Sequence, residues 1–252
     1  MSTPSVSTIR TPEAMATNLI LTGGPGHDFT STTAAIVDLC ESVGVASTIV
    51  EDPSVALKVL SEQPHTVDMM TVNALRWEMT QPRFRDLKQR WAYRPSPGEL
   101  ETLENFVRSG GALLACHAAP ICFDGDASWR RCLGATWVWD ASSHPVESSA
   151  QVTVTDVGAT HPITSGFDSF TVIDEIYGFL DSDADIVVLA TSAHGGSDHP
   201  VIWTRNVGDG RVVVDLLGHS RRSIDHPTHH ELLRRSVHWL LPTFTTPNTI
   251  GV

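Results

Sequence analysis

Three histidines each follow a short apolar run that ends in small residues, and they are the side chains best suited to chemistry in this chain. They are His27, His117 and His219. A further apolar run leads to Glu175, with Tyr177 two residues later. Imidazoles combined with a carboxylate hold divalent metals or act as acid and base groups. The chain has no His-x-His or His-Glu-x-x-His spacing, so such a site must be assembled from distant segments.

Short apolar runs bounded by glycine are typical of buried strands. In open α/β sheets, ligands bind at the carboxyl ends of the strands. We therefore predict one site at that edge, with a divalent metal held by His27, His117, Glu175 and His219. The metal would be zinc, manganese, iron or nickel, and His117, Glu175 and Tyr177 would also be catalytic groups. The alternative for each histidine alone is a surface or hydrogen-bonding role.

Cys116 lies directly before His117, in the segment Gly110–Pro120. A thiolate at a sharp strand-to-helix turn has a lowered pKa and acts as a nucleophile, so Cys116 is a further candidate catalytic residue. His117 would be its base if the turn brings the two side chains together. The alternative is that Cys116 is a small buried side chain, as free cysteines commonly are. The sequence leaves both interpretations open.

Four residues are candidates for binding the substrate: His144, Asp28, Trp139 and Arg211. His144 follows a pair of tryptophans, of which Trp139 would stack on a sugar face or pack in the core. Arg211 would face an anionic group or form a structural salt bridge. The glycine-rich turn at 23–26 matches neither Gly-x-Gly-x-x-Gly nor Gly-x-x-x-x-Gly-Lys, so no nucleotide cofactor is expected.

Strands and helices alternate along the chain, which predicts an α/β fold with a parallel sheet and right-handed crossovers. The expected strands span residues 18–22, 45–50, 66–72, 112–115, 151–156, 186–190, 200–204 and 211–216. The expected helices span residues 30–43, 54–63, 128–133 and 228–240, with another that opens at 97–99. Residues 191–199 are expected to form a polar loop, and 206–210 a hairpin turn.

Residues 75–94 interrupt this alternation with six of the 17 basic residues of the chain, interleaved with aromatic ones. We expect an excursion that lies on the surface or against a partner subunit. The alternative is binding to single-stranded nucleic acid, for which basic and aromatic side chains are suited. The formal charge of the whole chain is -12, which disfavours nucleic acid and anionic membranes as partners.

The 252 residues, 41% of them hydrophobic, are enough for one large domain. We predict a flexible arm over residues 1–17, a single domain over 18–241 and a tail over 242–252. The arm is rich in Ser, Thr and Pro and lacks the apolar core of a signal peptide, and no apolar run reaches the length of a membrane span. Four cysteines without a Cys-x-x-Cys pair favour a reducing compartment, so a cytoplasmic location is expected.

Eight motifs occur in an order that is specific to one family. They are the segments 26–29 (Gly-His-Asp-Phe), 110–119 (Gly-Gly-Ala-Leu-Leu-Ala-Cys-His-Ala-Ala), 134–137 with 144–145, 161–164, 174–177 (Asp-Glu-Ile-Tyr), 200–203, 208–212 and 217–219 (Leu-Gly-His). On these motifs the chain resembles the ThuA-like (trehalose-utilisation) family of the class I glutamine amidotransferase-like superfamily. The resemblance implies a flavodoxin-like three-layer sandwich with a mostly parallel central sheet. It also implies a link to carbohydrate metabolism, particularly to 3-keto sugars made by partner oxidoreductases.

The residue before the elbow histidine distinguishes this chain within that family. The position is usually aliphatic there, whereas Cys116 and His117 resemble the Cys-His elbow of the related PfpI group. The Gly-x-Gln that follows the nucleophile of glutamine amidotransferases is replaced here by the segment 118–120, Ala-Ala-Pro. Glutamine hydrolysis is therefore not expected.

These observations lead us to expect an enzyme that acts on a keto-sugar or keto-glycoside by metal-assisted elimination, isomerisation or hydrolysis. One alternative is a Cys116-dependent hydrolase or glyoxalase-like enzyme of the PfpI type. Another is a sugar-binding module without catalysis. The expected partner is a small sugar derivative, with a second copy of the chain as a candidate, and neither nucleic acid nor a membrane.

Overall fold

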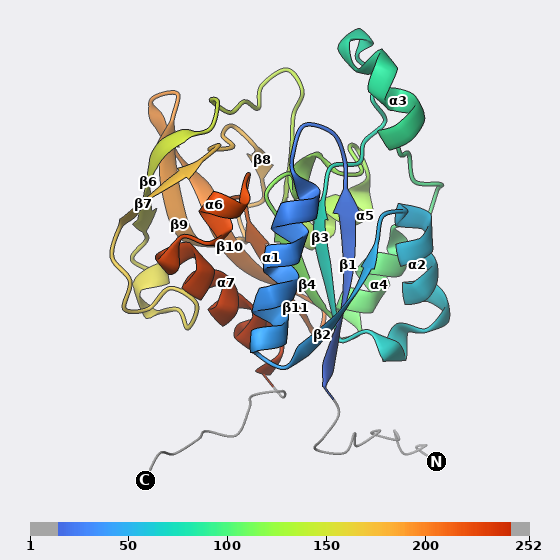
Figure 1. Ribbon diagram of the computed structural model, residues 1–252, viewed down its shortest axis with the longest axis horizontal. Helices are drawn as coiled ribbons and strands as arrows, with labels where there is room; N and C mark the ends of the chain where they lie inside the picture. The colour runs from blue at the N-terminus through green and yellow to red at the C-terminus, as the bar shows by residue number, and fades with distance from the viewer. Residues whose placement is uncertain (1–14, 243–252) are drawn as a thin grey trace.

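The structure is a computed structural model that describes residues 15–242 (Figure 1). The predicted arm and tail therefore lie outside the described residues, except at their inner ends. Ala16 and Thr17 were expected in the arm but belong to the first strand. Ala16 is fully buried, and the Thr17 amide donates a hydrogen bond to the Asp68 carboxylate at 2.9 Å. The ordered fold thus begins before the expected boundary.

A large central sheet contains the eight strands that were expected and one more, β7. Its strands are β1 (Ala16–Gly23), β2 (Val45–Val50), β3 (Met69–Ala74), β4 (Ala112–Cys116), β6 (Ser148–Val154), β7 (Phe170–Asp174), β9 (Val187–His194), β10 (Ser197–Val207) and β11 (Gly210–Asp215). Within residues 15–242 the nine strands lie in the order β2-β1-β3-β4-β11-β10-β9-β6-β7. A separate small ladder pairs β5 (Ala135–Thr136) with β8 (Asp181–Ser182).

The central sheet has a parallel half and an antiparallel half. The strands from β2 to β11 are parallel to their neighbours, as the alternation of strands and helices predicted. From β11 to β7 each neighbouring pair is antiparallel. The predicted hairpin before β11 is present, and β10 and β11 pair from Val207 and Gly210 onward.

The prediction of a polar loop over residues 191–199 is wrong. These residues form the ends of β9 and β10, which meet at a hairpin through Gly195 and Gly196. Both glycines have positive φ values, 59° and 82°, as a tight two-residue hairpin of the I′ kind requires. The polar side chains of this stretch had suggested a loop, but they lie on a hairpin whose backbone is paired.

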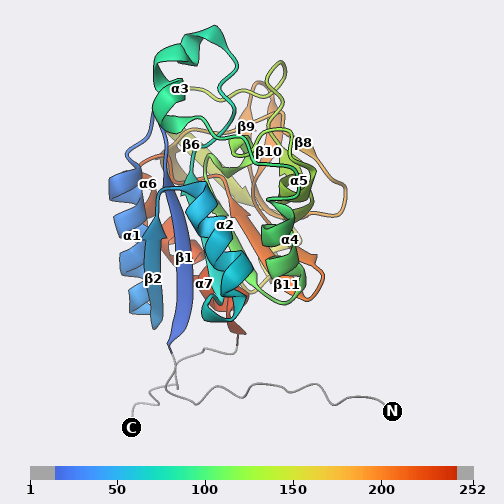
Figure 2. The same cartoon turned by 90° about the vertical axis from the view of Figure 1, so that its right-hand side faces the viewer.

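Helices cover both faces of the sheet and make three layers (Figure 2). The α-helices are α1 (Phe29–Ser42), α2 (Pro53–Glu62), α3 (Arg85–Trp91), α4 (Glu101–Arg108), α5 (Ala127–Leu133), α6 (Arg221–Ile224) and α7 (Pro227–Leu240). Short 3-10 turns span Pro64–Thr66, Pro82–Phe84, Ala119–Ile121 and Gly158–Thr160. Helices α1, α6 and α7 pack together on one face, and α2, α4 and α5 on the other. This is the α/β three-layer sandwich that was expected.

Alternate residues of the central strands supply two separate cores, one on each face. In β1, Leu19 and Leu21 point to the core beneath α2 and α4, and Ile20 points to the core beneath α1 and α7. Each buried side chain of this kind stabilises the fold by roughly 1.5–3 kcal/mol. Burial on both faces explains why these strands are predominantly apolar, and the buried Thr71 hydroxyl is satisfied by a hydrogen bond to Asn18. Only their carboxyl ends remain available for polar chemistry.

The basic excursion leaves the body of the molecule at α3. All residues of α3 are at least partly exposed, and the helix projects from the body in both views (Figures 1 and 2). The segment that leads to it is anchored, since Trp77 and Met79 are buried. The surface position fits the expectation for this excursion.

Candidate metal centre

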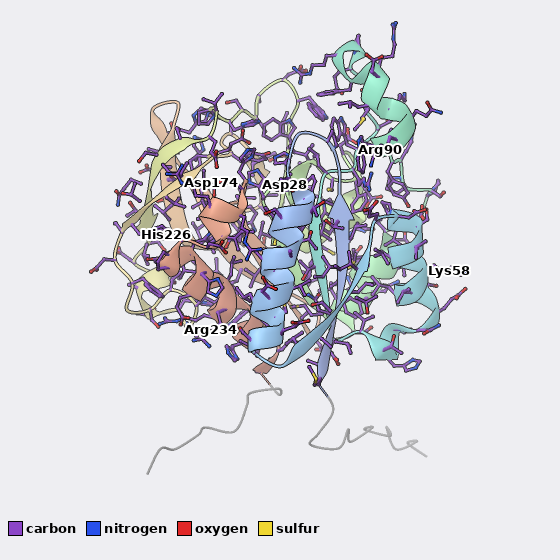
Figure 3. All side chains as sticks on the ribbon, in the orientation of Figure 1. Asp28, Lys58, Arg90, Asp174, His226 and Arg234 are labelled. Atoms are coloured by element: carbon purple, nitrogen blue, oxygen red, sulfur yellow. The ribbon has the colours of Figure 1, made fainter. Side chains whose placement is uncertain are left out.

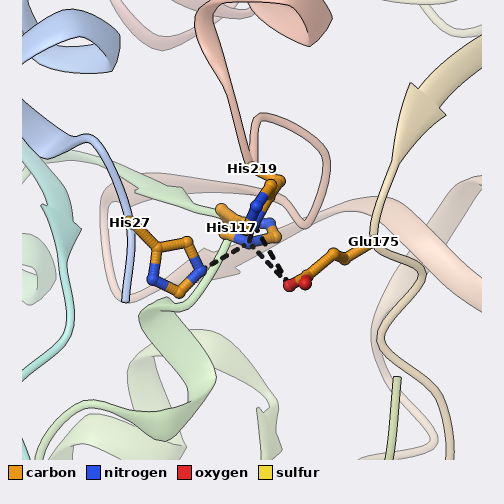
Figure 4. A group of neighbouring side chains, drawn as sticks. All are labelled: His27, His117, Glu175 and His219. Carbon is orange, nitrogen blue, oxygen red and sulfur yellow. Dashed lines mark hydrogen bonds and ion pairs between the residues drawn. The ribbon is translucent and has the colours of Figure 1, made fainter. Parts of the chain in front are cut away.

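The carboxyl edge of the sheet brings together the residues predicted as metal ligands (Figure 4). Each comes from a different connection: His27 from the turn between β1 and α1, His117 after β4, Glu175 after β7 and His219 after β11. One potential ligand atom from each residue lies within 4.8 Å of the others. Strands from both halves of the sheet therefore supply the cluster.

The spacing of these atoms fits a small cation. His117 Nε2 is 3.1 Å from His27 Nε2 and 3.3 Å from His219 Nδ1. Glu175 Oε2 is 3.1 Å from His219 Nδ1 and 3.8 Å from His117 Nε2. Two ligands of a tetrahedral zinc ion, each about 2.0–2.1 Å from the metal, are about 3.3 Å apart. The four donors thus already have approximately the separations that coordination requires.

The hydrogen bonds at the far side of two rings assign their tautomers. His27 Nδ1 lies 3.2 Å from the Pro25 carbonyl, and His117 Nδ1 lies 2.9 Å from the Leu216 carbonyl. A carbonyl oxygen only accepts, so each Nδ1 carries the proton and each neutral ring has a bare lone pair on Nε2. These two lone pairs face each other at 3.1 Å. Facing lone pairs repel unless a positive charge lies between them, and this donor set therefore suits a cation.

The charges of the cluster suit a cation as well. Burial, followed by the charge of His117, lowers the pKa of His27 to about 4, so its imidazole is neutral at pH 7. Burial alone would raise the pKa of Glu175, but the neighbouring imidazoles of His117, His219 and His144 hold it well below its usual range. The hydrogen bond to Glu175 raises the pKa of His219. An ionised carboxylate therefore lies beside nitrogen donors.

A strained turn directs His117 toward this cluster. Its φ of 43° is in the left-handed region, which residues with a Cβ seldom adopt. The His117 amide donates to the Asp215 carbonyl at 2.7 Å, which ties the turn to the end of β11. The turn thus gives the sharp elbow that the small residues after β4 predicted.

Asp174 holds the loops that carry two of the ligands. It is fully buried, and its carboxylate accepts hydrogen bonds from the amides of Glu175 (2.8 Å), Gly218 (2.7 Å) and His219 (3.1 Å). The hydroxyl of Ser223 donates to the same carboxylate. Figure 3 shows Asp174 beside α6. Asp174 therefore fixes the positions of Glu175 and His219 relative to each other.

A buried ion pair continues this network into α7. His229 Nε2 lies 3.1 Å from an Asp215 carboxylate oxygen, and its Nδ1 donates to the Ser223 carbonyl at 2.9 Å. Burial lowers the pKa of His229, but the charge of Asp215 outweighs this, so that the pKa is raised overall. Ser223, His229 and Asp215 are all buried, so this Ser-His-Asp chain is out of reach of a substrate.

Sequence analysis missed this network, although two signals were present. Asp215 ends a run of three valines, where an unpaired charge would be costly, and His229 lies on the apolar face of the last helix. Each of these two positions places an ionisable side chain in an apolar environment, where it requires a buried partner.

Aromatic side chains line one side of the cluster. The Tyr177 ring is 4.8 Å from that of His117 and stacks on His144 at 4.8 Å. His144 Nδ1 is 3.3 Å from Glu175 Oε2, and Trp137 packs against Tyr177 at 5.4 Å. Burial raises the pKa of Tyr177 well above its usual value, so its hydroxyl keeps its proton. His144 and Tyr177 therefore both lie beside the cluster.

Trp139 lies one step farther from the cluster. Its indole N–H donates to the Asp124 carboxylate at 3.1 Å, and its ring packs near those of Trp77 (5.8 Å) and Trp137 (6.1 Å). Trp139 therefore belongs to an aromatic cluster beside the site, which agrees with the interpretation that this side chain has a packing role.

Cys116 points away from the cluster. Its side chain is 6% exposed and packs in the core beneath α1 and α7, on the face opposite to His117. Burial, followed by the charge of Asp215, raises the pKa of the Cys116 thiol well above its usual value. A nucleophilic cysteine needs the reverse, an accessible thiol with a lowered pKa. The structure therefore favours the packing interpretation of Cys116.

Two predicted substrate-binding residues have structural contacts instead. Asp28 caps α1, where its carboxylate accepts a hydrogen bond from the Ser31 amide at 3.0 Å (Figure 3). Arg211 lies at the start of β11, opposite Ala112, whereas the metal cluster lies past the end of that strand. Its guanidinium donates to the Trp239 carbonyl at 2.7 Å. The expectation that Arg211 faces the substrate at this site is corrected, because it lies at the other edge of the sheet.

Comparisons with known proteins agree with this fold. A family model named ThuA, described as trehalose utilisation, matches residues 19–240. A solved structure described as a ThuA-like protein from Parabacteroides merdae ATCC 43184 superimposes with a TM-score of 0.73 at 15% identity, over 94% of this chain and 93% of that one. A second, from Bacteroides uniformis ATCC 8492, has a TM-score of 0.66 at 16% identity, over 93% and 95% of the two chains.

A part of a larger enzyme has a similar fold. The β-galactosidase from Rahnella sp. R3 matches with a TM-score of 0.59 at 12% identity, over 90% of this chain but 31% of that one. No curated protein matches the sequence. None of the helices between residues 15 and 242 is long and apolar enough to cross a membrane.

Proposed function

Since the chain belongs to the ThuA (trehalose-utilisation) family, a carbohydrate-related one, we propose that it is a metal-dependent enzyme that acts on a keto-sugar or keto-glycoside. The proposed metal ligands are His27, His117, Glu175 and His219. The proposed reaction is proton abstraction next to the keto group, followed by elimination or isomerisation. Addition of water after elimination would give net hydrolysis.

The observation that carries this proposal is the pair of facing Nε2 lone pairs. His27 and His117 are both held with the proton on the other nitrogen, and Glu175 adds a negative charge beside them. Mixed nitrogen and oxygen donors are typical of zinc, manganese, iron and nickel. A soft, thiolate-binding metal is disfavoured because the nearby Cys116 points into the core.

A bound divalent metal would supply a Lewis acid that polarises the keto oxygen and stabilises negative charge on it. The protein would supply the proton transfers. The imidazole of His144 is about one-third exposed beside Glu175, where it would accept the proton from the carbon next to the carbonyl. Tyr177 is 1% exposed but packs directly against His117 and His144 of the site, so its hydroxyl, which keeps its proton, would donate to a substrate oxygen bound at the cluster. The aromatic rings of Trp137 and Tyr177 would orient the sugar.

Elemental analysis of the purified protein tests the metal directly. We expect about one equivalent of zinc, manganese, iron or nickel per chain, lost on substitution of the His117 donor. His117→Ala should therefore contain little metal, whereas His230→Ala, on the helix α7 and outside the cluster, should keep it.

Assays with 3-keto-glycosides then test the reaction. Turnover should be lost with chelators and restored by one of the four metals. A preparation that is free of metal and fully active would overturn the proposal. Tight sugar binding with no turnover by the metal-loaded protein would favour a sugar-binding module instead.

A further inference from the structure

Arg76 is a buried cation without a carboxylate partner. Its side chain is 5% exposed, and its Nη2 donates to the carbonyl oxygens of Glu51 at 2.8 Å and Thr22 at 3.5 Å. No carboxylate of residues 15–242 forms an ion pair with this guanidinium, and its Nε is buried without a hydrogen-bond acceptor. Burial lowers the pKa of Arg76, which is the sign of an uncompensated charge. A buried cation of this kind calls for an anion.

Arg76 lies where the order of the strands reverses. The chain leaves β1 toward β2 on one side and later returns to β3 on the other, so the switch is between β1 and β3. Ligands of open α/β sheets bind at such switch points, outside the carboxyl ends of the strands. Gly23 and Ala74 are paired at that end, and Arg76 follows Ala74 by two residues.

Gly23 makes room for the guanidinium. Its φ is +93°, and a Cβ at this position would lie 3.0 Å from Arg76 Nη2 and 3.4 Å from the Trp91 ring. The turn that begins at Gly23 also carries His27 to the metal cluster. One glycine-rich turn therefore contributes to both the cluster and the surroundings of Arg76.

A cavity of about 450 Å³ opens beside Arg76. Its walls include Arg90, Trp91 and Tyr93 from the end of the basic excursion, together with the start of α2 at Pro53 and Ser54. The guanidinium carbons of Arg76 and Arg90 are each 4.4 Å from the centroid of a Trp91 ring. Figure 3 labels Arg90, which comes from α3. This volume is in the range of cavities that bind small metabolites.

Glu51 and Asp52 also line this cavity. Asp52 is occupied as the cap of α2, where its carboxylate accepts a hydrogen bond from the Ser54 amide at 2.9 Å. Glu51 meets Arg76 through its backbone carbonyl rather than its carboxylate. Both carboxylates are exposed, and their charges raise the pKa of Arg76 by less than burial lowers it. Arg76 therefore remains incompletely compensated beside Arg90 and the start of the ten-residue helix α2.

We propose that this cavity binds the oxyanion group of a small metabolite, a phosphate or a carboxylate, between Arg76 and Arg90. Arginine forks match both groups geometrically, and the first turn of α2 would add favourable dipoles. The anion would supply the counter-charge that Arg76 lacks. This site is independent of the metal and of the reaction proposed above.

Calorimetric titration of the full chain tests the site, with inorganic phosphate and malonate in separate experiments. We expect saturable binding of one anion per chain with a Kd of about 1 mM or tighter. Arg76→Gln and Arg90→Gln should each weaken it by about tenfold or more. Arg94→Gln is the matched control, because Arg94 belongs to the same excursion but pairs with Glu78 at 3.0 Å. Binding of phosphate alone would assign a phosphorylated ligand, and binding of malonate alone would assign a carboxylate.

Two further experiments distinguish anion binding at this site from effects of the metal cluster and from a variant's failure to fold. Protein treated with a chelator, and the His117→Ala variant, should bind the anion as the wild type does, even if the proposed reaction fails. Arg90 is exposed, so Arg90→Gln remains decisive if Arg76→Gln does not fold. An isotherm that does not saturate, or equal affinity in wild type and Arg90→Gln, would overturn the proposal.

Discussion

At the scale of single residues, the adjacent side chains of Cys116 and His117 point in different directions. Cys116 is the last residue of β4 and points into the core, whereas His117 has φ of 43° and reaches the metal cluster. Adjacent side chains of a strand alternate in direction, and the turn preserves that separation. The two therefore cannot act as a thiolate and its base. The chemistry of this segment belongs to the imidazole.

Substitution of Cys116 tests this division. Cys116→Ser should keep its metal and its activity, while the buried hydroxyl lowers the free energy of unfolding by about 1 kcal/mol or more. Metal content, turnover and urea unfolding measure the three quantities. Cys116→Ala is the matched control without a polar atom. Loss of turnover in both variants, at full metal content, would restore the nucleophile hypothesis.

Tyr177 offers a second test at this scale. Tyr177→Phe should leave the metal content unchanged, because its hydroxyl is not among the clustered donors. It should lower kcat by about 10²-fold or more, the usual effect of removing a general acid. Unchanged kcat with a raised KM would instead assign the ring to substrate binding alone.

At the scale of elements, buried charges join helices to each other and to the sheet. His229 on α7 pairs with Asp215 at the end of β11, the strand that leads to His219. The bond holds α7 onto the sheet beneath the metal cluster. It thus connects helix packing with the geometry of the ligands.

Removal of this imidazole should affect both properties. His229→Gln should lower the free energy of unfolding by about 3 kcal/mol, because Asp215 would stay buried without its ion-pair partner. It should also weaken metal binding in a competition titration, whereas His230→Gln, its partly exposed neighbour, should change neither. An unstable variant with wild-type metal affinity would show that the pair does not position the ligands.

Glu104 links α4 to α5 and gives a test by pH. Its carboxylate accepts paired hydrogen bonds from Arg131 at 3.0 and 2.6 Å and another from Arg108 at 2.8 Å. These bonds lower its pKa from 4.5 to about 2, with Arg131 the largest cause. A lowered pKa in the folded state stabilises the protein above the unfolded value, and this stability is lost as the pH falls from 4.5 toward 2.

Glu104→Gln should therefore lower the free energy of unfolding at pH 7 by about 2 kcal/mol, less than the full shift implies because both arginines are half-exposed. The difference from wild type should shrink as the pH falls below 4.5. Chemical unfolding at several pH values measures it, with the exposed Glu101→Gln as the control. A difference that stays constant with pH would contradict this account.

The sequence predicted the elements best where one physical rule decides them. The apolar run before Cys116 gave the strand β4 almost to the residue, because burial on both faces leaves no other choice. The edge strand β2 is partly exposed, and its bounds followed from its β-branched residues and the turn residues at each end. The tip of the β9–β10 hairpin was missed because its backbone is paired while its side chains are polar and exposed. At the candidate site, the clustering of His27, His117, Glu175 and His219 could be predicted from strand ends. The contacts of Asp174 and Arg76 depend instead on partners far away in the chain.

At the scale of the whole molecule, charge is unevenly distributed. The chain carries -12 overall, yet five of its 17 basic residues lie between Pro82 and Arg94, on and beside the projecting helix α3. Leu87 on this helix is 37% exposed. A basic helix with an exposed leucine complements the acidic body of a second copy. We therefore keep the homodimer as a prediction.

Light scattering of the eluting protein tests this assembly. We expect a dimer at low salt that weakens as added salt screens the charges. Leu87→Glu should give a monomer. Val146→Glu, at another position that is 82% exposed, should leave the dimer intact. A wild-type protein that is monomeric at all salt concentrations would contradict the prediction of a homodimer.

The position of β11 in the sheet has a consequence for folding during synthesis. This strand is the last in the described chain, yet it lies in the middle of the sheet, between β4 and β10. During synthesis, β1 to β4 are complete early, but the open edge of β4 waits for its partner until Asp215 has left the ribosome. An unpaired, apolar edge strand is an aggregation hazard for as long as it waits. The insertion of β11 thus comes late in folding, and the four side chains of the candidate metal site meet only once it has taken place.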